Sequence, residues 1–209
     1  MNEKRAEPTV WVVDDDEAMR SSLKWLIESV GMRVEAYGSA DAFLQQHYPG
    51  RFGCLLLDVR MPGMGGLDLL EHLGREQMMP PTIIITGHGD VPMAVRALKN
   101  GALDFIEKPF NDEVLLDAIR HALAVEEERR ISAAQVAEYA ERVEHLTPRE
   151  LEVMKMVTDG RSNKEIANAL GVSAKTIEAH RARVMEKMQA GSLAELVRMV
   201  IAVEQRRAL

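Results

Sequence analysis

Acidic and polar residues stand where several apolar runs of this sequence end. They are Asp14, Asp15 and Asp16 after TVWVV, Asp58 in CLLLDV, Thr86 in TIIIT, and Lys108 with Pro109 after DFIE. Converging carboxylates repel one another unless a cation joins them, and all-oxygen ligands favour Mg²⁺. A carboxylate beside such a metal can attack a phosphoryl group and form an acyl phosphate. A nearby lysine and hydroxyl can bind the added phosphoryl oxygens. These residue types therefore predict a Mg²⁺-dependent phosphoacceptor site.

Each of these residues also has a simpler explanation when it is taken singly. A run of aspartates before a helix serves as a helix cap, and we expect Asp16 to cap the first helix. Lys108 or Thr86 alone would more often be a surface or cap residue. The functional interpretation rests on their joint placement at successive strand ends.

The elements that must position these residues alternate between strand and helix. Five apolar runs predict strands at 9–13, 33–37, 54–59, 82–86 and 104–107. Helical spacing lies between them, as in Leu23, Leu26, Ile27 and Val30. Nearly continuous apolar strands are typical of a parallel sheet covered on both faces, so we predict a doubly wound α/β domain. In the flavodoxin-like order 2-1-3-4-5, the carboxyl ends of strands 1 and 3 face one crevice, the expected site for chemistry.

The composition indicates a globular protein with two differently charged parts. The 209 residues carry a net charge of −7, which divides into −10 for residues 1–145 and +3 for residues 146–209. The single cysteine, Cys54, excludes an internal disulfide framework and fits a reducing cytosol. No apolar run approaches the roughly 18–20 residues that span a bilayer, and the N-terminus has no signal-peptide core. We therefore expect a cytoplasmic protein without a membrane partner.

The motifs VVDDDEA, LLLDVRMPGMGG, TIIITGHGDVPMAVRALKNGA and DFIEKPF resemble the receiver domain of two-component response regulators. The resemblance covers residues 9 to about 123. It implies Asp58 as the phosphoacceptor, and Mg²⁺ held by Asp14, Asp15, Asp58 and the backbone carbonyl of Arg60. It also implies Thr86 as the switch hydroxyl, Lys108 as the phosphate partner before a cis bond to Pro109, and Phe105 as the switch aromatic. Plain core packing is the alternative for Phe105.

Such a site implies a switch. Phosphorylation of Asp58 would draw Thr86 toward the phosphoryl group and empty space that Phe105 can fill. The surface built from the fourth helix, about 92–99, and the fifth strand would then change shape.

The last 64 residues predict four short helices with capping signals. They are the segments 146–160, 163–170, 173–188 and 192–205, with Thr147 and Glu150 forming a capping-box pattern. Two helices joined by the tight turn at Gly171 are a helix-turn-helix arrangement. The third helix faces the core with Ile177, Val184 and Met188, and small residues on its opposite face would let it approach the major groove. An ordinary solvated, mixed-charge face is the alternative.

The motifs LTPRELEV, NKEIANALGVSAKTIEAHRARVMEKM and SLAELV resemble the LuxR-type helix-turn-helix domain of FixJ/NarL-type regulators. The resemblance implies residues 162–169 as scaffold helix and 173–188 as recognition helix. It implies DNA contacts from Lys175, Thr176, Glu178, Ala179, Ala182 and Arg183. Many relatives have a basic residue where Glu178 stands, so nonspecific affinity is expected to be weaker here.

The connecting segment 122–146 has no Gly or Pro and predicts a helix. Val136, Tyr139, Val143 and Leu146 have the spacing of a two-heptad coiled-coil seam. The same residues could instead pack on one of the two domains, and the sequence leaves both alternatives open.

We therefore predict a receiver at 1–123, a helical linker at 124–145 and a LuxR-type DNA-binding domain at 146–209. The expected function is a phosphorylation-dependent transcriptional regulator that dimerises and binds promoter DNA. Its implied partners are a sensor histidine kinase, double-stranded DNA and RNA polymerase. It is not expected to be an enzyme beyond assisting its own phosphotransfer and autodephosphorylation. The alternatives are a phosphorylation-independent DNA binder with a vestigial receiver and a haloacid-dehalogenase-like hydrolase. The hydrolase is considered because Asp14-x-Asp16 mimics the D-x-D motif with which that family starts.

Overall fold

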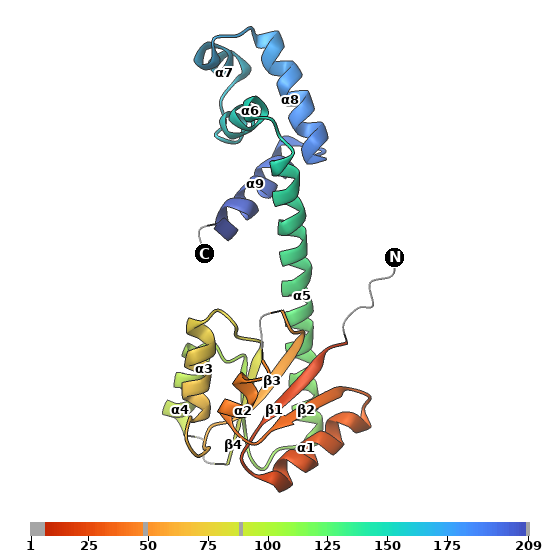
Figure 1. Ribbon diagram of the computed structural model, residues 1–209, viewed down its shortest axis with the longest axis vertical. Helices are drawn as coiled ribbons and strands as arrows, with labels where there is room; N and C mark the ends of the chain where they lie inside the picture. Colours follow the sequence, from red (N-terminus) through yellow and green to blue (C-terminus); the bar gives the residue numbers. More distant parts are fainter. Residues whose placement is uncertain (1–6, 48–49, 88–89, 208–209) are drawn as a thin grey trace. The chain divides into compact units, whose positions relative to one another are not determined.

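The computed structural model describes residues 7–47, 50–87 and 90–207. The chain divides into two compact units, residues 1–129 and 130–209. The first is an α/β unit, and the second is helical (Figure 1).

The first unit is built on a parallel sheet of five strands in the order β2-β1-β3-β4-β5, as predicted. The strands are β1 (Thr9–Val13), β2 (Arg33–Tyr37), β3 (Gly53–Asp58), β4 (Thr82–Thr86) and β5 (Asp104–Glu107). The third strand begins and ends one residue earlier than predicted, so Asp58 is its last residue. β1 and β3 are neighbours in this order, so the residues that follow β1 meet the end of β3 at one edge of the sheet.

Helices cover both faces of this sheet because alternate strand residues point to opposite sides. The helices are α1 (Glu17–Ser29), α2 (Ala40–Leu44), α3 (Gly66–Arg75), α4 (Val91–Lys99) and α5 (Asp112–Glu144). Val10 and Val12 lie in one apolar core with residues of α1 and α5. Trp11 and Val13 lie in the other core with residues of α2, α3 and α4 (Figure 1). This double covering explains why the central strands are apolar throughout.

The second unit packs α6 (Pro148–Thr158), α7 (Asn163–Leu170), α8 (Ala174–Met188) and α9 (Leu193–Arg207) around one apolar core. Thr147 and Glu150 form the predicted capping box of α6, and Ser173 caps α8 as expected. α7 begins one residue later than the scaffold helix implied by the resemblance. Its C-cap is Gly171, whose φ of +67° lies in the left-handed region that a glycine adopts without strain.

The connecting segment is helical, as predicted, and it continues the fifth helix of the first unit without a break. α5 runs for 33 residues. At its end, Val143 is buried in the core of the second unit, and Tyr139 and Leu146 pack against that core. Three of the four seam residues therefore pack in or against the core of the second unit, which favours packing on a domain over a coiled coil.

No helix in the described ranges is apolar enough over sufficient length to cross a membrane. Among these helices only α5 has the length that a membrane span needs, and it carries many charges.

Candidate functional site

Two buried carboxylates and a lysine meet at the carboxyl edge of the sheet. Asp14 follows β1, Asp58 ends β3, and Lys108 follows β5. The Lys108 Nζ donates to Asp14 Oδ2 at 2.7 Å and to Asp58 Oδ1 at 2.9 Å. Asp14 and Asp58 are 94 and 50 positions from Lys108 in the chain, and the strand order brings them together.

Burial and charge act in opposite directions in this group. Burial raises the pKa of Asp58, and the hydrogen bond from Lys108 only partly offsets it. Burial lowers the pKa of Lys108, but hydrogen bonds to Asp14 and Asp58 outweigh burial and leave that pKa raised. The lysine is therefore held as a cation between two carboxylate oxygens, which shows that this edge of the sheet accommodates positive charge.

The other residues implied as metal ligands lie around this pair. Asp15 is exposed, and the Arg60 backbone N–H donates to the second oxygen of Asp58 at 2.7 Å. Asp16 accepts from the N–H groups of Ala18 and Met19 and caps α1, as expected. Within the described residues, no group of three or more His, Cys, Asp or Glu side chains is placed closely enough to hold a metal ion. The donors present are carboxylate oxygens, which suit Mg²⁺.

Thr86 and Phe105 lie on the two strands next to this edge. Thr86 is 1% exposed at the end of β4, and its carbonyl accepts from the Lys108 N–H at 2.8 Å. Phe105 is half-buried on β5, pairs in register with Ile84, and packs against the core that contains α4. The bond before Pro109 is cis, as the resemblance implied.

Arg20 is a residue of this site that the sequence interpretation missed. Its Nη1 donates to the backbone carbonyls of Asp14 and Asp15, at 2.8 Å in each case. An arginine on an amphipathic helix has no signal in the sequence that distinguishes it from a surface residue.

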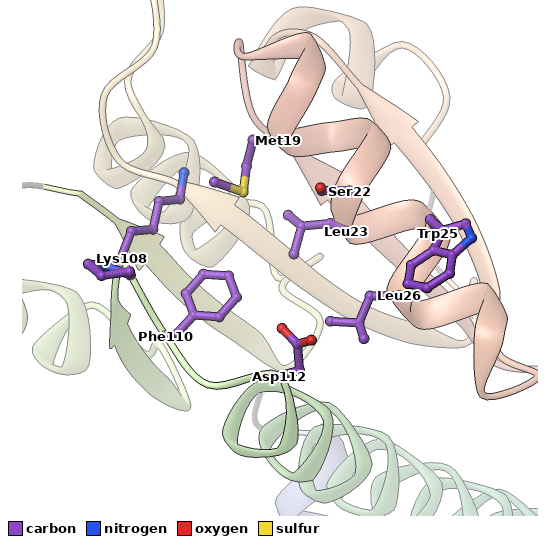
Figure 2. Close-up of a pocket in the computed structure, with 9 residues that line it drawn as sticks. Met19, Ser22, Leu23, Trp25, Leu26, Lys108, Phe110 and Asp112 are labelled. Atoms are coloured by element: carbon purple, nitrogen blue, oxygen red, sulfur yellow. The ribbon is translucent and has the colours of Figure 1, made fainter.

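A pocket of about 300 Å³ adjoins the lysine between α1 and the start of α5. Figure 2 shows that apolar side chains of α1, including Leu23 and Leu26, face Phe110 across it. Lys108 lines the pocket as well as the acidic site. Trp25 lies at its margin with 74% of its surface exposed. The site thus has an apolar surface beside it.

The second unit presents the predicted recognition face to solvent. All six residues named for DNA contact are exposed, whereas Ile177, Val184 and Met188 are buried, as predicted. Arg181, next to this face, donates to Asn163 Oδ1 at 2.7 Å and ties α8 to α7. α8 therefore has an anchored face and a free face with two alanines.

A partly buried ion pair in the same unit was not foreseen either. Lys187 Nζ donates to Glu150 at 2.6 Å and to the carbonyl of His145 at 3.2 Å. The sequence indicated the capping role of Glu150 but not its partner 37 positions away. This pair connects the start of α6 with the end of the recognition helix.

Comparisons with known proteins agree with both units. Residues 10–120 match the response regulator receiver domain family, and residues 144–200 match the bacterial regulatory proteins of the luxR family. Nodulation protein W of Bradyrhizobium diazoefficiens is 48% identical over 94% of this chain and 87% of its own length. Transcriptional regulatory protein FixJ of the same organism is 48% identical over 92% of this chain and 94% of its own.

Solved structures give the same result. The response regulator StyR is 43% identical and superposes with a TM-score of 0.79 over 93% of this chain and 98% of that chain. Full-length FixJ from B. japonicum is 46% identical, with a TM-score of 0.57 over 96% of this chain and 98% of that chain. Neither the hydrolase nor the vestigial-receiver alternative is favoured by these relatives. The chain belongs to the two-component response regulators that join a receiver to a LuxR-type helix-turn-helix domain, and it is a phosphorylation-dependent transcriptional regulator.

Proposed function

We propose that Asp58 is the phosphoacceptor and that a sensor histidine kinase supplies the phosphoryl group. An Asp58 oxygen attacks phosphorus, the bond from phosphorus to the histidine nitrogen breaks, and an acyl phosphate forms. The supporting observation is the contact of Lys108 with both Asp58 and Asp14. The protein's own chemistry would be limited to this transfer and to the later hydrolysis of the acyl phosphate.

Mg²⁺ would be held by the buried carboxylates of Asp14 and Asp58 and by the carbonyl of Arg60, and the exposed side chain of Asp15 would turn toward it to complete the protein ligands. Bound there, it would offset the negative charge that gathers between the carboxylates and the incoming phosphoryl group. Lys108 is already a cation in contact with Asp58, and it would bind the added oxygens. The Thr86 hydroxyl at the end of β4 would bind another, and Phe105 would follow its movement.

The kinase would dock on the pocket between α1 and α5. A phosphohistidine must come within bonding distance of Asp58, so its carrier must cover the surface around Lys108. The pocket begins at this lysine and offers apolar area with an exposed aromatic, Trp25, at its margin. Large aromatic residues of this kind often contribute much of the energy of an interface.

Phosphorylation of Asp58 would lead to dimerisation through α4. Val91, Val95 and Leu98 are exposed and recur at the spacing of one helix face, whereas only Ala97 of this helix is fully buried. A helix with so little buried surface can shift at modest cost, and its exposed apolar face would be covered by a second copy.

The recognition helix α8 would enter the major groove of promoter DNA. Lys175 and Arg183 would contact phosphates, and Glu178 would accept a hydrogen bond from cytosine N4. Two copies on paired half-sites would compensate for the modest +3 charge of residues 146–209. Residues 1–123 would form the receiver and residues 124–145 the connector, and residues 146–209 would contact RNA polymerase. The regulator would act in the cytoplasm.

The test is the Asp58→Asn variant, treated with acetyl phosphate and Mg²⁺ and analysed by intact mass. Wild type should gain one phosphoryl group and form a dimer with higher promoter affinity, and D58N should do neither. The exposed Asp68→Asn change on α3 is the matched control and should leave phosphorylation intact. If D58N is modified as readily as wild type, Asp58 is not the acceptor. If phosphorylated wild type shows the same size and affinity as before, the receiver does not control DNA binding.

A further inference from the structure

The loop that carries the acidic residues is held by one side chain from α1. Arg20 lies one turn into that helix, and a single guanidinium nitrogen donates to the carbonyls of both Asp14 and Asp15. These are consecutive peptide groups of the loop. Fixing both carbonyls fixes the direction in which the two carboxylates leave the backbone.

The remaining restraints of the loop act on other atoms. One Asp14 carboxylate oxygen accepts from the Asp16 N–H at 2.9 Å, and the Asp16 carboxylate caps α1. The Asp14 N–H donates to the carbonyl of Tyr37 on β2. The Asp15 side chain is exposed, so its orientation depends on the backbone that Arg20 holds.

The neighbouring loop leaves room for this guanidinium. Gly38 follows β2, and a Cβ added there would stand 3.5 Å from two atoms of the Arg20 guanidinium. A methyl group would fit in ordinary contact, but a larger side chain would press on the arginine. The position of Arg20 is thus bounded by the acidic loop on one side and by the backbone at Gly38 on the other.

We infer that Arg20 is a positioning residue that preorganises Asp14 and Asp15 for a divalent cation. This inference rests on the proposed Mg²⁺ site. Its physical basis is that a loop already held in its binding conformation loses less conformational freedom when the cation binds. Arg20 contributes this order although its own charge opposes a second cation.

The two effects of Arg20 have opposite signs, which makes the role testable. As a mere positive charge near three aspartates, Arg20 would repel Mg²⁺, and its removal would tighten binding. As a positioning residue, its removal would weaken binding because the loop must then be ordered by the cation. A substitution that removes both hydrogen bonds and the charge reveals which effect is larger.

The experiment compares the full-length wild type with Arg20→Met, which retains an unbranched side chain like the stem of arginine but removes the guanidinium, and Arg20→Lys, which retains the charge. The dissociation constant for Mg²⁺ is measured from amide chemical shifts during a titration with MgCl₂. We expect R20M to bind Mg²⁺ about fivefold or more weakly, and R20K to recover part of the loss through its single donor group. In phosphorylation by acetyl phosphate, R20M should need more Mg²⁺ for half-maximal rate while its rate at saturating Mg²⁺ stays near that of wild type.

The control is Arg33→Met, which removes an equal charge from the exposed start of β2 and should leave Mg²⁺ affinity unchanged. Unfolding followed by tryptophan fluorescence confirms that each variant is folded at the titration temperature. Equal or tighter Mg²⁺ binding by R20M, with normal binding by wild type, overturns the role of Arg20 alone. Absence of Mg²⁺ binding by wild type overturns the proposed metal site and this inference with it.

Discussion

The pair of buried Glu150 and partly exposed Lys187 should make a measurable, pH-dependent contribution to the stability of the DNA-binding unit. The Glu150 carboxylate accepts from Lys187 Nζ at 2.6 Å and from the Thr147 N–H at 2.9 Å, and the residue is 3% exposed. Substitution Glu150→Gln retains the shape and an acceptor for Thr147 but removes the charge. The variant therefore isolates the electrostatic part of the contact.

The size of the effect follows from the acidity of this carboxyl group. The hydrogen bond from Lys187, and next that from Thr147, lower the pKa of Glu150 from 4.5 to about 2. A change of this size corresponds to about 3 kcal/mol, at about 1.4 kcal/mol for each tenfold change in acidity. Because the Lys187 side chain is 36% exposed, solvent screens part of the attraction. We therefore expect E150Q to lower the free energy of unfolding of this unit by about 2 kcal/mol at neutral pH.

The difference between wild type and E150Q should depend on pH in one direction. The pKa of Glu150 is lower in the folded than in the unfolded state, so ionisation stabilises the fold. This contribution is complete above a pH of about 4.5, the unfolded value, and is lost as the pH falls toward about 2. The loss caused by E150Q should therefore be constant from neutral to mildly acidic pH and shrink below that range.

Two spectroscopic signals separate the units in the full-length protein. Both tryptophans, Trp11 and Trp25, lie in the first unit, so their fluorescence reports the unfolding of the receiver. Far-ultraviolet circular dichroism reports the helices of both units. E150Q should lower the midpoint temperature of the DNA-binding unit's unfolding, seen by circular dichroism, by about 10 °C. The midpoint temperature of the transition seen by fluorescence should not change.

The exposed Glu165 supplies the control because it forms the same kind of capping box with Ser162, and no ion pair with a lysine is found for it among the described residues. Glu165→Gln should destabilise less than E150Q. The reasoning is refuted if E150Q costs less than about 0.5 kcal/mol, the value of an ordinary surface pair. A loss that is equal at neutral pH and at about pH 3.5 would refute it as well.

Other substitutions test the site and the fold. Lys108→Met leaves two carboxylates, one of them Asp58, without the cation that bridges them. Chemical denaturation should show a less stable receiver in EDTA and a larger gain from Mg²⁺ than in wild type; equal gains would contradict this. Gly66→Ala would place a Cβ 2.1 Å from the Asp58 carbonyl oxygen and should cost at least about 2 kcal/mol. Gly74→Ala, in the same helix with open space around it, should be neutral or stabilising in the same denaturation assay. Lys175→Gln should weaken DNA binding uniformly across sequences and reduce the salt dependence of log K by about 1, whereas altered sequence preference would indicate a base contact.

The sequence was sufficient to identify the helices and strands, because their formation depends on local signals. Apolar runs with helical spacing between them identified all five strands, and the capping residues Asp16, Thr147 and Ser173 marked the starts of their helices. The errors at the ends of elements were one or two residues. The third strand was displaced by one, for example, because Gly53 pairs with Thr9 across the sheet and no pattern within the strand records that pairing.

Part of the candidate site could also be predicted, for a reason that is equally local. Each polar residue stood at the end of an apolar run, and parallel strands end at the same edge of a sheet. The prediction that Asp14, Asp58 and Lys108 lie together followed from that rule once the strand order was assumed. The order itself could not be obtained from the residues alone, since it depends on which strands pair across long separations in the chain.

The sequence by itself determined the elements, the division of charge and the family of this protein, because each is encoded in nearby residues or in motifs. Only the tertiary structure decided that Lys108 bridges two carboxylates, that Arg20 holds the acidic loop, and that Lys187 pairs with Glu150. It also decided that Val143 is buried in the core of the DNA-binding unit rather than in a seam between two copies. These contacts depend on the direction and reach of single side chains after packing, and residue spacing along the chain contains no record of that direction.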